Sequence, residues 1–565
     1  MSLASRSGDR PGWLGAALGR LFDFWPMVTV AALVLTTLLL LLPVYNIVGL
    51  SFSGTEAGRS LFDNYVMFFS EPYYYRSLIN SFIVSISATI LALLVGIPAA
   101  YFVSRYNIWA RSLIKTVVVL TFVSPPFIGS YSWVILLGRS GVLTRLFAEY
   151  AIPLPSIYGA PGIIFVFTLQ YFPFVFLLVS SGLKSIDQSV EDAARNLGSG
   201  EFATFIKVIA PLLLPSITAA ALLVFVAAFT DLGTPLILGE KFRVLPLLIY
   251  GEFVNDFGGQ PVLASTLSVL LLAVTTAALL LQRWLSARFS HSTAAIRPLT
   301  MQEPPPLKRF LAAFYVYLLM AIAILPLVNI LVSSFLKANG PVLTSELSLE
   351  NYRRIAGTLS RPLWNTILFT STATLACAVV GTLIAYIIVR RAGRISALLD
   401  TIVMFSYAVP GIVLGVGLVV TYHYPPFALT GTALILIMAY FIRRLPFSVR
   451  ASASALQQLS RDTEEASVNL GAGPAATFAR VTVPLLSMAI LSGVLLTWSN
   501  TIRELSATLI LQSGSTTTVS IEIFNEVVNG NFGVASALGS ILILLTFLPL
   551  ILLFTLMGKN EEALV

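Results

Sequence analysis

Three ionisable side chains, Asp231, Arg503 and Glu504, lie within stretches that are otherwise apolar. Asp231 and Glu504 stand 273 positions apart, at the same register of two similar segments, and Arg503 directly precedes Glu504. A charge near the centre of a bilayer costs roughly 2.5–3.5 kcal/mol on insertion scales, so it normally faces a partner or water. Two such carboxylates could attract a cation, or close a gate together with the guanidinium. The alternatives are solvated helix ends near the outer interface and a structural ion pair.

A second repeated pair consists of Glu252 with Asn255 and Glu526 with Asn529, each spaced i and i+3. This spacing places both side chains of a pair on one helix face. Each pair lies in the last outer loop of its repeat, where it could contact another protein. Exposed polar residues on a short surface helix are the alternative. The two histidines lie in unrelated segments, so we assign no metal site.

The longest repeat is a polar segment that occurs twice without a gap, at residues 191–198 and 464–471. Gly198 and Gly471 stand where a helix should end, a position that favours residues tolerating positive φ. Pro211 and Pro484 should mark the start of the next membrane span, where a missing N–H does least harm. A polar segment kept twice at one place in a repeat indicates docking of a second protein. An amphipathic loop helix without a partner is the alternative.

Within the first copy, Ser185 followed by Gln188 has the form of an N-terminal capping box. Small residues after the acidic pair of each copy allow close approach of another chain. The residues to which we assign the docking role are Glu191, Asp192, Ala193, Ala194, Gly198 and Pro211, with Glu464, Glu465, Ala466, Ser467, Gly471 and Pro484.

The elements that must position these residues are predicted to be transmembrane helices. The chain is 57% hydrophobic and 11% charged, about half the charge of a soluble domain. A spanning helix needs roughly 20 apolar residues, and such runs recur about twelve times, six in each half. We place them near 27–50, 77–104, 113–137, 161–183, 213–235, 263–285, 310–336, 363–389, 396–421, 427–447, 485–511 and 534–557. The chain is therefore predicted to be an all-α polytopic membrane protein.

The distribution of basic residues predicts the topology. With the N-terminus inside, about two thirds of the 34 Lys and Arg residues fall in inner segments, as the positive-inside rule expects. Both termini and both polar segments are then cytoplasmic. The net charge of +8 is thereby explained by topology, without a nucleic-acid partner. The first span is too long for the core of a cleavable signal peptide.

The duplication extends over both halves. Pro125 corresponds to Pro410 at an offset of 285 residues, and Pro173 corresponds to Pro446 at an offset of 273. The first half therefore has about 12 extra residues between these two prolines, and we place them in the loop at 138–159. Six spans is an even number, so the two repeats are parallel, with a translocation path between them. The predicted divisions are 1–26, an N-terminal segment; 27–285, the first half, with its polar loop at 184–212; 286–309, a linker; 310–557, the second half, with its polar loop at 457–485; and 558–565, a tail. We interpret the proline-rich linker as an extended tether with no other role.

The polar segments also carry a family resemblance. Glu-Ala-Ala, three residues, Gly, nine residues and Ile-x-Leu-Pro is typical of permease subunits of binding-protein-dependent ATP-binding-cassette (ABC) importers. The spacing is intact in both copies, with Asp192 replacing Glu in the first and Ser467 replacing the second Ala in the other. The resemblance implies the type I ABC importer permease fold in its fused form. It also identifies residues 184–212 and 457–485 as coupling loops, whose short helices sit in grooves on two ATPase subunits.

This resemblance implies the partners as well. The chain has no Gly-x-x-x-x-Gly-Lys-Ser/Thr loop, so ATP and Mg would be bound by the ATPase subunits, most simply a homodimer, and this chain would be no enzyme and hold no cofactor. A periplasmic or lipid-anchored binding protein would deliver the substrate, with Glu252, Asn255, Glu526 and Asn529 as contacts. The setting would be the bacterial inner membrane and its lipid.

Short segments at 231–236 and 503–509 resemble the ferric-iron branch of this family. Thiamine, phosphonate and sugar phosphate importers are the alternatives within the class. Outside it, an ion-gradient-driven secondary transporter can also have two parallel six-span halves, with Asp231 and Glu504 as ion sites. A channel or structural scaffold would leave the duplicated polar segments unexplained.

Overall fold

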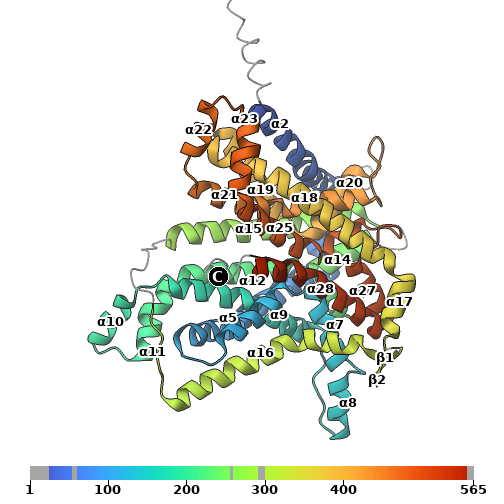
Figure 1. Ribbon diagram of the computed structural model, residues 1–565. Helices are drawn as coiled ribbons and strands as arrows, with labels where there is room; N and C mark the ends of the chain where they lie inside the picture. The colour runs from blue at the N-terminus through green and yellow to red at the C-terminus, as the bar shows by residue number, and fades with distance from the viewer. Residues whose placement is uncertain (1–23, 54–59, 255–258, 290–298, 341, 557–565) are drawn as a thin grey trace, which may run out of the picture. The chain divides into compact units, whose positions relative to one another are not determined.

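The computed structural model describes residues 24–53, 60–254, 259–289, 299–340 and 342–556 (Figure 1). Almost all of its regular structure there is helical, as the apolar composition predicts. The one sheet in the described residues is a hairpin of β1 (Leu336–Asn339) and β2 (Val342–Leu347). The predicted fold class is confirmed.

The elements of the first half, in chain order, include two π-helical segments, η1 and η2. They are α2 (Phe24–Thr36), η1 (Thr37–Leu41), α3 (Leu42–Ser51), α4 (Asp63–Ser70), α5 (Pro72–Arg105), α6 (Arg111–Val123), α7 (Pro126–Leu137), α8 (Val142–Glu149), α9 (Ala160–Lys184), α10 (Gln188–Asn196), α11 (Glu201–Thr204), η2 (Phe205–Ile209), α12 (Ala210–Thr230), α13 (Gly233–Leu238), α14 (Leu245–Phe253) and α15 (Pro261–Phe289). The extra sequence at 138–159 thus forms α8 and its flanks.

The helices of the second half repeat most of this order. They are α16 (Pro306–Ser334), α17 (Glu350–Thr358), α18 (Ser360–Arg390), α19 (Arg394–Ala408), α20 (Gly411–Tyr422), α21 (Ala433–Gln458), α22 (Asp462–Asn469), α23 (Pro474–Thr477), η3 (Phe478–Thr482, π-helical), α24 (Val483–Leu485), α25 (Ser487–Thr501), α26 (Ser506–Leu511), α27 (Val519–Val528) and α28 (Phe532–Leu556).

By length and composition, 8 helices in the described residues could each cross a membrane, or up to 11 spans if each bent pair counts as one. The prediction was about twelve. The difference lies at the predicted span 427–447, which is α21. Every 18-residue window of α21 contains Arg443, Arg444 and Arg450, which is more charge than the composition of a candidate span allows.

The third span of each half is bent at equivalent prolines rather than straight. Helix α6 and the segment Pro126–Glu149, which contains α7 and α8, are bent by 100°, and α19 and α20 meet at 109°. Pro125 and Pro410 are the N-caps of α7 and α20, both with extended ψ angles of 128° and 146°. Proline has no N–H to continue the preceding helix and also disfavours helical geometry in the residue before it. The repeat seen in the sequence is therefore also a repeat of backbone geometry.

The residues form two compact units that cut across the sequence halves. Among the described residues, one unit comprises 24–43, 370–407 and 437–501, and the other comprises 44–53, 60–254, 259–289, 299–340, 342–369, 408–436 and 502–556. In the first unit, α2 from the first half lies with helices of the second half, where Trp25 stacks on Tyr386 at 4.1 Å between ring centroids. In the second unit, α16 from the second half packs on α5, α6 and α7 of the first. Each half therefore sends its first helix into the unit that carries the other half's coupling loop.

The core of the second unit is a close packing of α5 against α9 and α12. Ala88, Ala92 and Ala99 on α5 are fully buried, and a Cβ on Gly96 would lie 2.7 Å from Cβ of Val175 on α9. Small residues let two helix backbones approach closely where lipid provides no hydrophobic drive. This packing fixes the C-terminal end of α5, on which the first coupling loop rests.

The linker is shorter than predicted. Helix α15 continues to Phe289 and α16 begins at Pro306, so both consume part of the predicted 286–309. Residues 299–305 are described and make specific hydrogen bonds, so the interpretation as a tether with no other role is incomplete.

Candidate functional site

Both coupling loops turn at glycine in the same way. Gly198 has φ +83° and Gly471 has φ +90°, as the sequence predicted. In the first loop the N–H of Ser199 donates to the Ala194 carbonyl at 3.0 Å, and that of Gly198 to Arg195 at 2.9 Å. This pair of bonds is the Schellman arrangement, which satisfies carbonyls that a helix end leaves free.

The second loop repeats this pair of bonds at the same register. The N–H of Ala472 donates to the Ser467 carbonyl at 3.1 Å, and that of Gly471 to Val468 at 2.9 Å. Each loop is therefore two short helices joined at a glycine that holds a left-handed backbone, α10 with α11 and α22 with α23.

The start of α10 differs from the predicted capping box. Asp187 is the N-cap, and its carboxylate accepts from the N–H of Ser189 at 2.9 Å. Ser185 instead donates to the carbonyl of Gly182 at 2.8 Å, at the end of α9. The prediction was wrong because it placed the cap two residues early, and Asp and Ser are almost equally good N-caps.

Pro211 and Pro484 lie in the first turn of α12 and α24, as the sequence predicted, but the chain before each of them is already helical. Each follows a π-helical segment, η2 or η3, rather than opening a helix after a loop. The N–H of Ala210 donates to the carbonyl of Phe205, and that of Val483 to Phe478, five residues back. A wider turn accommodates a proline ring that would clash with the carbonyl four residues before it.

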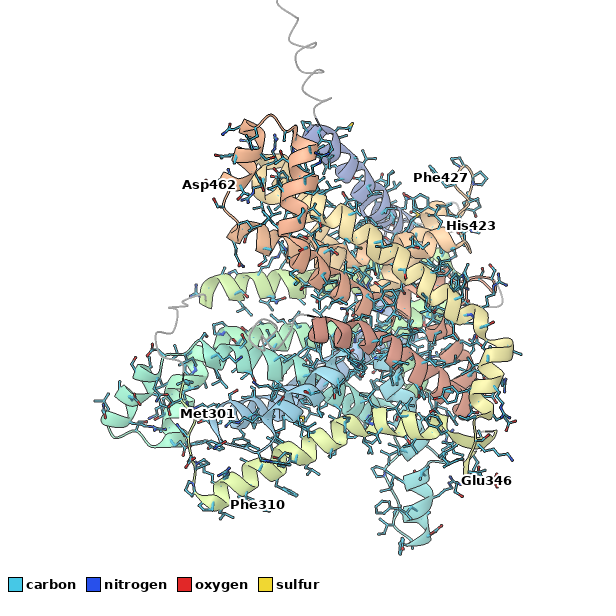
Figure 2. The ribbon with its side chains drawn as sticks, viewed as in Figure 1. Met301, Phe310, Glu346, His423, Phe427 and Asp462 are labelled. Carbon is cyan, nitrogen blue, oxygen red and sulfur yellow. The ribbon has the colours of Figure 1, made fainter. Side chains whose placement is uncertain are left out.

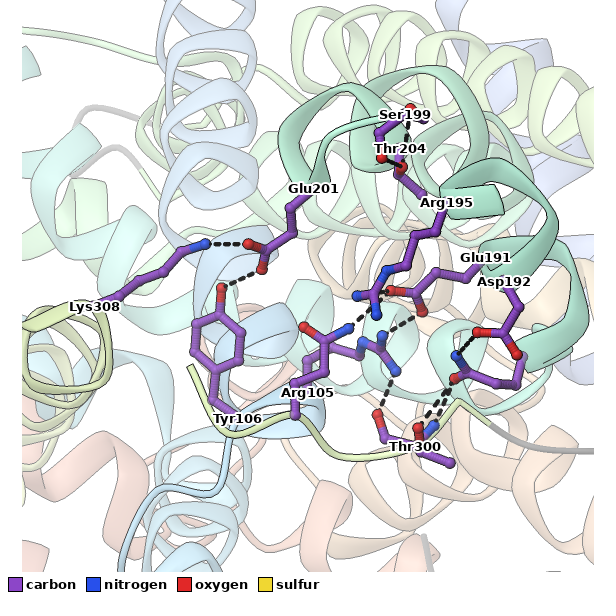
Figure 3. Close-up of polar contacts among 12 residues, drawn as sticks. Arg105, Tyr106, Glu191, Asp192, Arg195, Ser199, Glu201, Thr204, Thr300 and Lys308 are labelled. Carbon is purple, nitrogen blue, oxygen red and sulfur yellow. Dashed lines mark hydrogen bonds and ion pairs between the residues drawn. The ribbon is translucent and has the colours of Figure 1, made fainter. Parts of the chain in front are cut away.

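The first coupling loop is built around the carboxylate of Glu191, which is 2% exposed (Figure 3). Arg105, at the end of α5 and fully buried, forms an ion pair with it. Arg195 donates at 2.7 Å and the amide of Gln302 at 2.8 Å. A buried carboxylate with several charge-assisted bonds holds its helix in one orientation.

The second loop is built around Glu464 in the same manner but more loosely. Arg390 donates from Nε at 3.3 Å, the hydroxyl of Tyr386 at 3.2 Å and that of Thr482 at 3.3 Å. The Arg390–Glu464 pair is 8% and 13% exposed by side chain. This pair repeats the Arg105–Glu191 ion pair.

Sequence reasoning missed these arginines, although a signal was present. Arg105 and Arg390 stand 285 positions apart, the offset already found for Pro125 and Pro410. Their aromatic neighbours are repeated as well, Tyr101 and Tyr386 at the offset of 285, and Phe205 and Phe478 at the offset of 273. Tyr101 contacts Phe205 with ring centroids 4.9 Å apart, and Tyr386 contacts Phe478 at 5.3 Å.

The first loop has a second polar contact. The carboxylate of Glu201, at the start of α11, binds Lys308 of α16 and accepts from the hydroxyl of Tyr106 at 3.1 Å (Figure 3). Burial, with the nearby Glu201 carboxylate, raises the pKa of Tyr106 to about 12. The tyrosine therefore stays protonated and remains a donor.

Each loop presents a matching outer face. Leu197 and Leu470 are equivalent, follow the last turn of α10 and α22, and are each 89% exposed. The acidic and small residues beside them, Asp192 with Ala193 and Glu465 with Ala466, are also exposed. Asp462, labelled in Figure 2, is the first residue of α22. Each loop therefore carries one strongly exposed leucine at the same position of the repeat.

The buried charges predicted to line a pathway have local structural roles. Asp231 accepts from the N–H of Thr234 at 2.8 Å and from Tyr171 at 3.2 Å. Glu504 accepts from the N–H of Ala507 at 3.2 Å. Each carboxylate thus satisfies a free N–H at the start of a short helix, α13 or α26.

Arg503 joins segments from the two sequence halves within one unit. Its Nη1 donates to the carbonyls of Phe122, Val123 and Ser124 at 3.1, 2.9 and 3.1 Å. These carbonyls end α6 just before the bend at Pro125, where helix bonding stops. A cation there satisfies them and complements the negative end of the helix dipole.

The residues predicted to contact a binding protein are only partly accessible. Glu526 is 5% exposed and pairs with Arg354 at 3.4 Å, and Asn529 is the C-cap of α27. Glu252 lies on α14 and is half-buried, and burial raises the pKa of its carboxyl while Arg243 opposes the rise. Asn255 lies outside the described residues.

Comparison with known proteins gives the context of this site. A family model described as the binding-protein-dependent transport system inner membrane component matches residues 92–291 and 378–560. These two matches cover more than half of the chain, and each contains one coupling loop. The chain belongs to this family.

The permease is 30% identical over 505 residues to the ferric transport system permease protein FbpB of Actinobacillus pleuropneumoniae, covering 86% of the permease and 72% of that relative. It is 24% identical over 485 residues to the Fe(3+)-transport system permease protein FbpB 2 of Haemophilus influenzae, covering 84% and 89%. A solved bacterial ABC transporter, involved in the import of the acidic polysaccharide alginate, matches at a TM-score of 0.39 and 16% identity, covering 49% of the permease and 99% of its own chain.

Family membership fixes the permease's general role. It is the membrane subunit of an ABC importer and is not itself catalytic. Its partners are ATPase subunits, which bind ATP, and a substrate-binding protein. Its several apolar spans make it a multi-pass protein, consistent with the bacterial inner membrane.

Proposed function

We propose that the permease imports ferric iron, delivered by a periplasmic or lipid-anchored binding protein and driven by ATP hydrolysis on an ATPase homodimer. The names of its relatives support the substrate, as do the segments at 231–236 and 503–509. Iron is cargo here rather than a resident cofactor. In the part of the chain that the structure describes, no cluster of three or more His, Cys, Asp or Glu could hold a metal. Selection of the metal therefore rests with the binding protein.

The observation that carries the coupling role is the pair of equivalent exposed faces. Leu197 and Leu470 project at corresponding positions, while Glu191 and Glu464 fix each helix from behind. A twofold ATPase would meet two nearly identical surfaces, which favours a homodimer. The sequence lacks a phosphate-binding Gly-rich loop, so ATP and Mg belong to that partner. Cytoplasmic coupling loops and cytoplasmic termini follow from the charge distribution.

For the pathway we propose that Arg503 is a gate residue and that Asp231 and Glu504 support it. Three carbonyl bonds link α6 to the segment before α26. If a path opens between the two halves, either the hydrogen bonds of Arg503 break, or α6 and the segment before α26 move together. Replacing Arg503 with methionine should then raise the leak of small ions through proteoliposomes. An unchanged leak with unchanged transport would show that Arg503 only satisfies the end of α6.

The test of the importer is reconstitution of the permease with its copurifying ATPase in proteoliposomes. Ferric iron presented on the cognate binding protein should cross the membrane only when ATP is present on the side that carries the ATPase. The iron-loaded binding protein should also stimulate ATP hydrolysis. Retention of no ATPase together with uptake that needs no ATP would refute the proposal. Stimulation by thiamine, phosphonate or sugar phosphate on that binding protein, but not by ferric iron, would refute the substrate alone.

A further inference from the structure

The end of the linker lies along the first coupling loop. The amide of Gln302 donates to Oε1 of Glu191 at 2.8 Å. The N–H and hydroxyl of Thr300 both reach Oε1 of Gln188, at 2.9 and 3.3 Å. Three hydrogen bonds therefore join residues 299–303 to two side chains of α10, one of them the buried carboxylate on which the loop is built.

The same segment is also bonded to the end of α5. The N–H of Gln302 donates to the carbonyl of Arg105 at 2.7 Å, and the N–H of Asn107 donates to the carbonyl of Gln302 at 3.4 Å. Gln302 and Tyr106 form an isolated parallel bridge. Arg105 itself binds the carbonyl of Thr300 with one guanidinium nitrogen and Glu191 with the other (Figure 3). The segment thus lies between α5 and α10 and is held by both.

The segment continues directly into α16. Lys308, in the first turn of α16, pairs with Glu201 of α11. Further along, Tyr315 donates to the carbonyl of Val95 on α5 at 2.8 Å. The first coupling loop is therefore bonded at α10 and at α11 to one continuous stretch that leads into the first span of the second half.

The second coupling loop is held differently. The described partners of Glu464 are Arg390, Tyr386 and Thr482, and all belong to the second half itself. At Glu464 the third described donor is a hydroxyl of η3, that of Thr482, whereas at Glu191 it is the linker amide of Gln302. The Thr482 hydroxyl approaches to 3.3 Å, against 2.8 Å for Gln302.

We infer that residues 299–303 are a strap that positions the first coupling loop and links its movement to α16. The strap makes the two loops unequal, with α10 held more firmly than α22. The effect of the strap on transport rests on the proposed coupling function. The hydrogen bonds of the strap belong to the permease alone, without its partners.

The first experiment is hydrogen exchange on the purified permease in nanodiscs, without ATPase. Gln302→Glu places a carboxylate against Glu191 and should make the α10 amides exchange about tenfold faster, because a buried acceptor loses its donor and meets a like charge. Gln302→Lys keeps a donor and should stay within about twofold of the wild type. The matched control, Thr482→Val, should speed exchange in α22 and leave α10 unchanged.

The inference of a strap would be overturned by unchanged exchange of the α10 amides in Gln302→Glu. It would also be overturned by equally faster exchange in both loops, which would indicate general loosening.

The second experiment measures ATP hydrolysed per substrate imported in the reconstituted complex. Gln302→Glu should raise this ratio severalfold and Gln302→Lys should not. An unchanged ratio beside faster α10 exchange would overturn the link to transport. Failure of the wild-type permease to bind any ATPase would instead refute the proposed function, with the exchange result unaffected.

Discussion

The first coupling loop holds Glu191 at 2% exposure with Arg105, Arg195 and Gln302, whereas the second holds Glu464 with longer bonds from Arg390, Tyr386 and Thr482. Their turns at Gly198 and Gly471 are nearly the same. The difference teaches that the repeat preserves the outer face and its turn, while the supports behind it have diverged. The first loop is hydrogen-bonded to the linker. The polar partners of Glu464 belong to the second half, and Trp25 of α2 packs on Tyr386 and Phe478 beside them.

The largest contrast should come from removing the arginines. Arg105→Met leaves the buried Glu191 without its main counter-charge and should destabilise the permease by about 3–5 kcal/mol. Arg390→Met should have a smaller effect, because its pair with Glu464 is longer and more exposed. Thermal unfolding of both variants in one detergent measures the difference. Adding Glu191→Leu to Arg105→Met should recover much of the loss, and equal losses in the two single variants would contradict the proposed asymmetry.

Substitutions on the exposed faces of the two loops should have equal effects, in contrast to substitutions of the buried supports. Leu197→Gln and Leu470→Gln should leave unfolding within about 0.5 kcal/mol of the wild type, since both side chains are almost fully exposed. Each should weaken ATPase binding by about 2 kcal/mol if it is a central contact, roughly 30-fold. Titration of the ATPase into nanodisc-bound permease checks this. Unchanged binding in the double variant would remove these leucines from the interface.

Replacing the turn glycine should impair transport equally in both loops. Gly198→Val and Gly471→Val each force a β-branched residue into a left-handed backbone, at about 1–2 kcal/mol. The space around each is open, so strain and not a clash is the cause. Hydrolysis should continue while uptake falls. Gly200→Ala and Gly473→Ala are the matched controls, with φ of −66° and −69° and open space. Normal coupling in the double valine variant would contradict the hinge.

The smallest expected effect is that of a single hydroxyl. Tyr386→Phe removes the 3.2 Å bond to Glu464 and keeps the stack on Trp25, so it should destabilise the second loop by about 0.5–1.5 kcal/mol. Exchange rates of the α22 amides are the measure. An effect larger than that of Arg390→Met would show that the tyrosine and not the arginine is the main support.

Much of this arrangement was predictable from the sequence because it depends on local geometry. Glycine at a left-handed turn acts within a few residues, so the turns at Gly198 and Gly471 were predicted from the repeat and the residue type. Pro125 and Pro410 were recognised as a repeated pair, but the bends beside them were not predicted. The supports of Glu191 were not predicted either, since Arg105 and Gln302 lie 86 and 111 positions away. Contacts of that kind depend on packing, although the repeat of Arg105 at Arg390 was a usable signal.

Asp231 and Glu504 illustrate a different limit. Their register and polarity were read correctly, but a carboxylate that caps α13 or α26 and one that faces a pathway have the same sequence pattern. Only the positions of Thr234 and Ala507 distinguish the two. Whether either carboxylate also meets substrate stays a prediction.

The helices that follow the two loops also differ, and the difference affects how far a movement of each loop would be transmitted. Residues 201–230 form one continuous helix of 30 residues, a rod of roughly 45 Å whose far end adjoins Asp231. A tilt of about 5° at the N-terminal end of such a rod would shift the other end by about 4 Å. In the second half the equivalent helix is broken at Leu486 by 75°, and a break of that kind absorbs rotation. Under the proposed coupling function, equal displacements of the two loops by the ATPase subunits would therefore move the membrane-spanning residues of the two halves by unequal amounts.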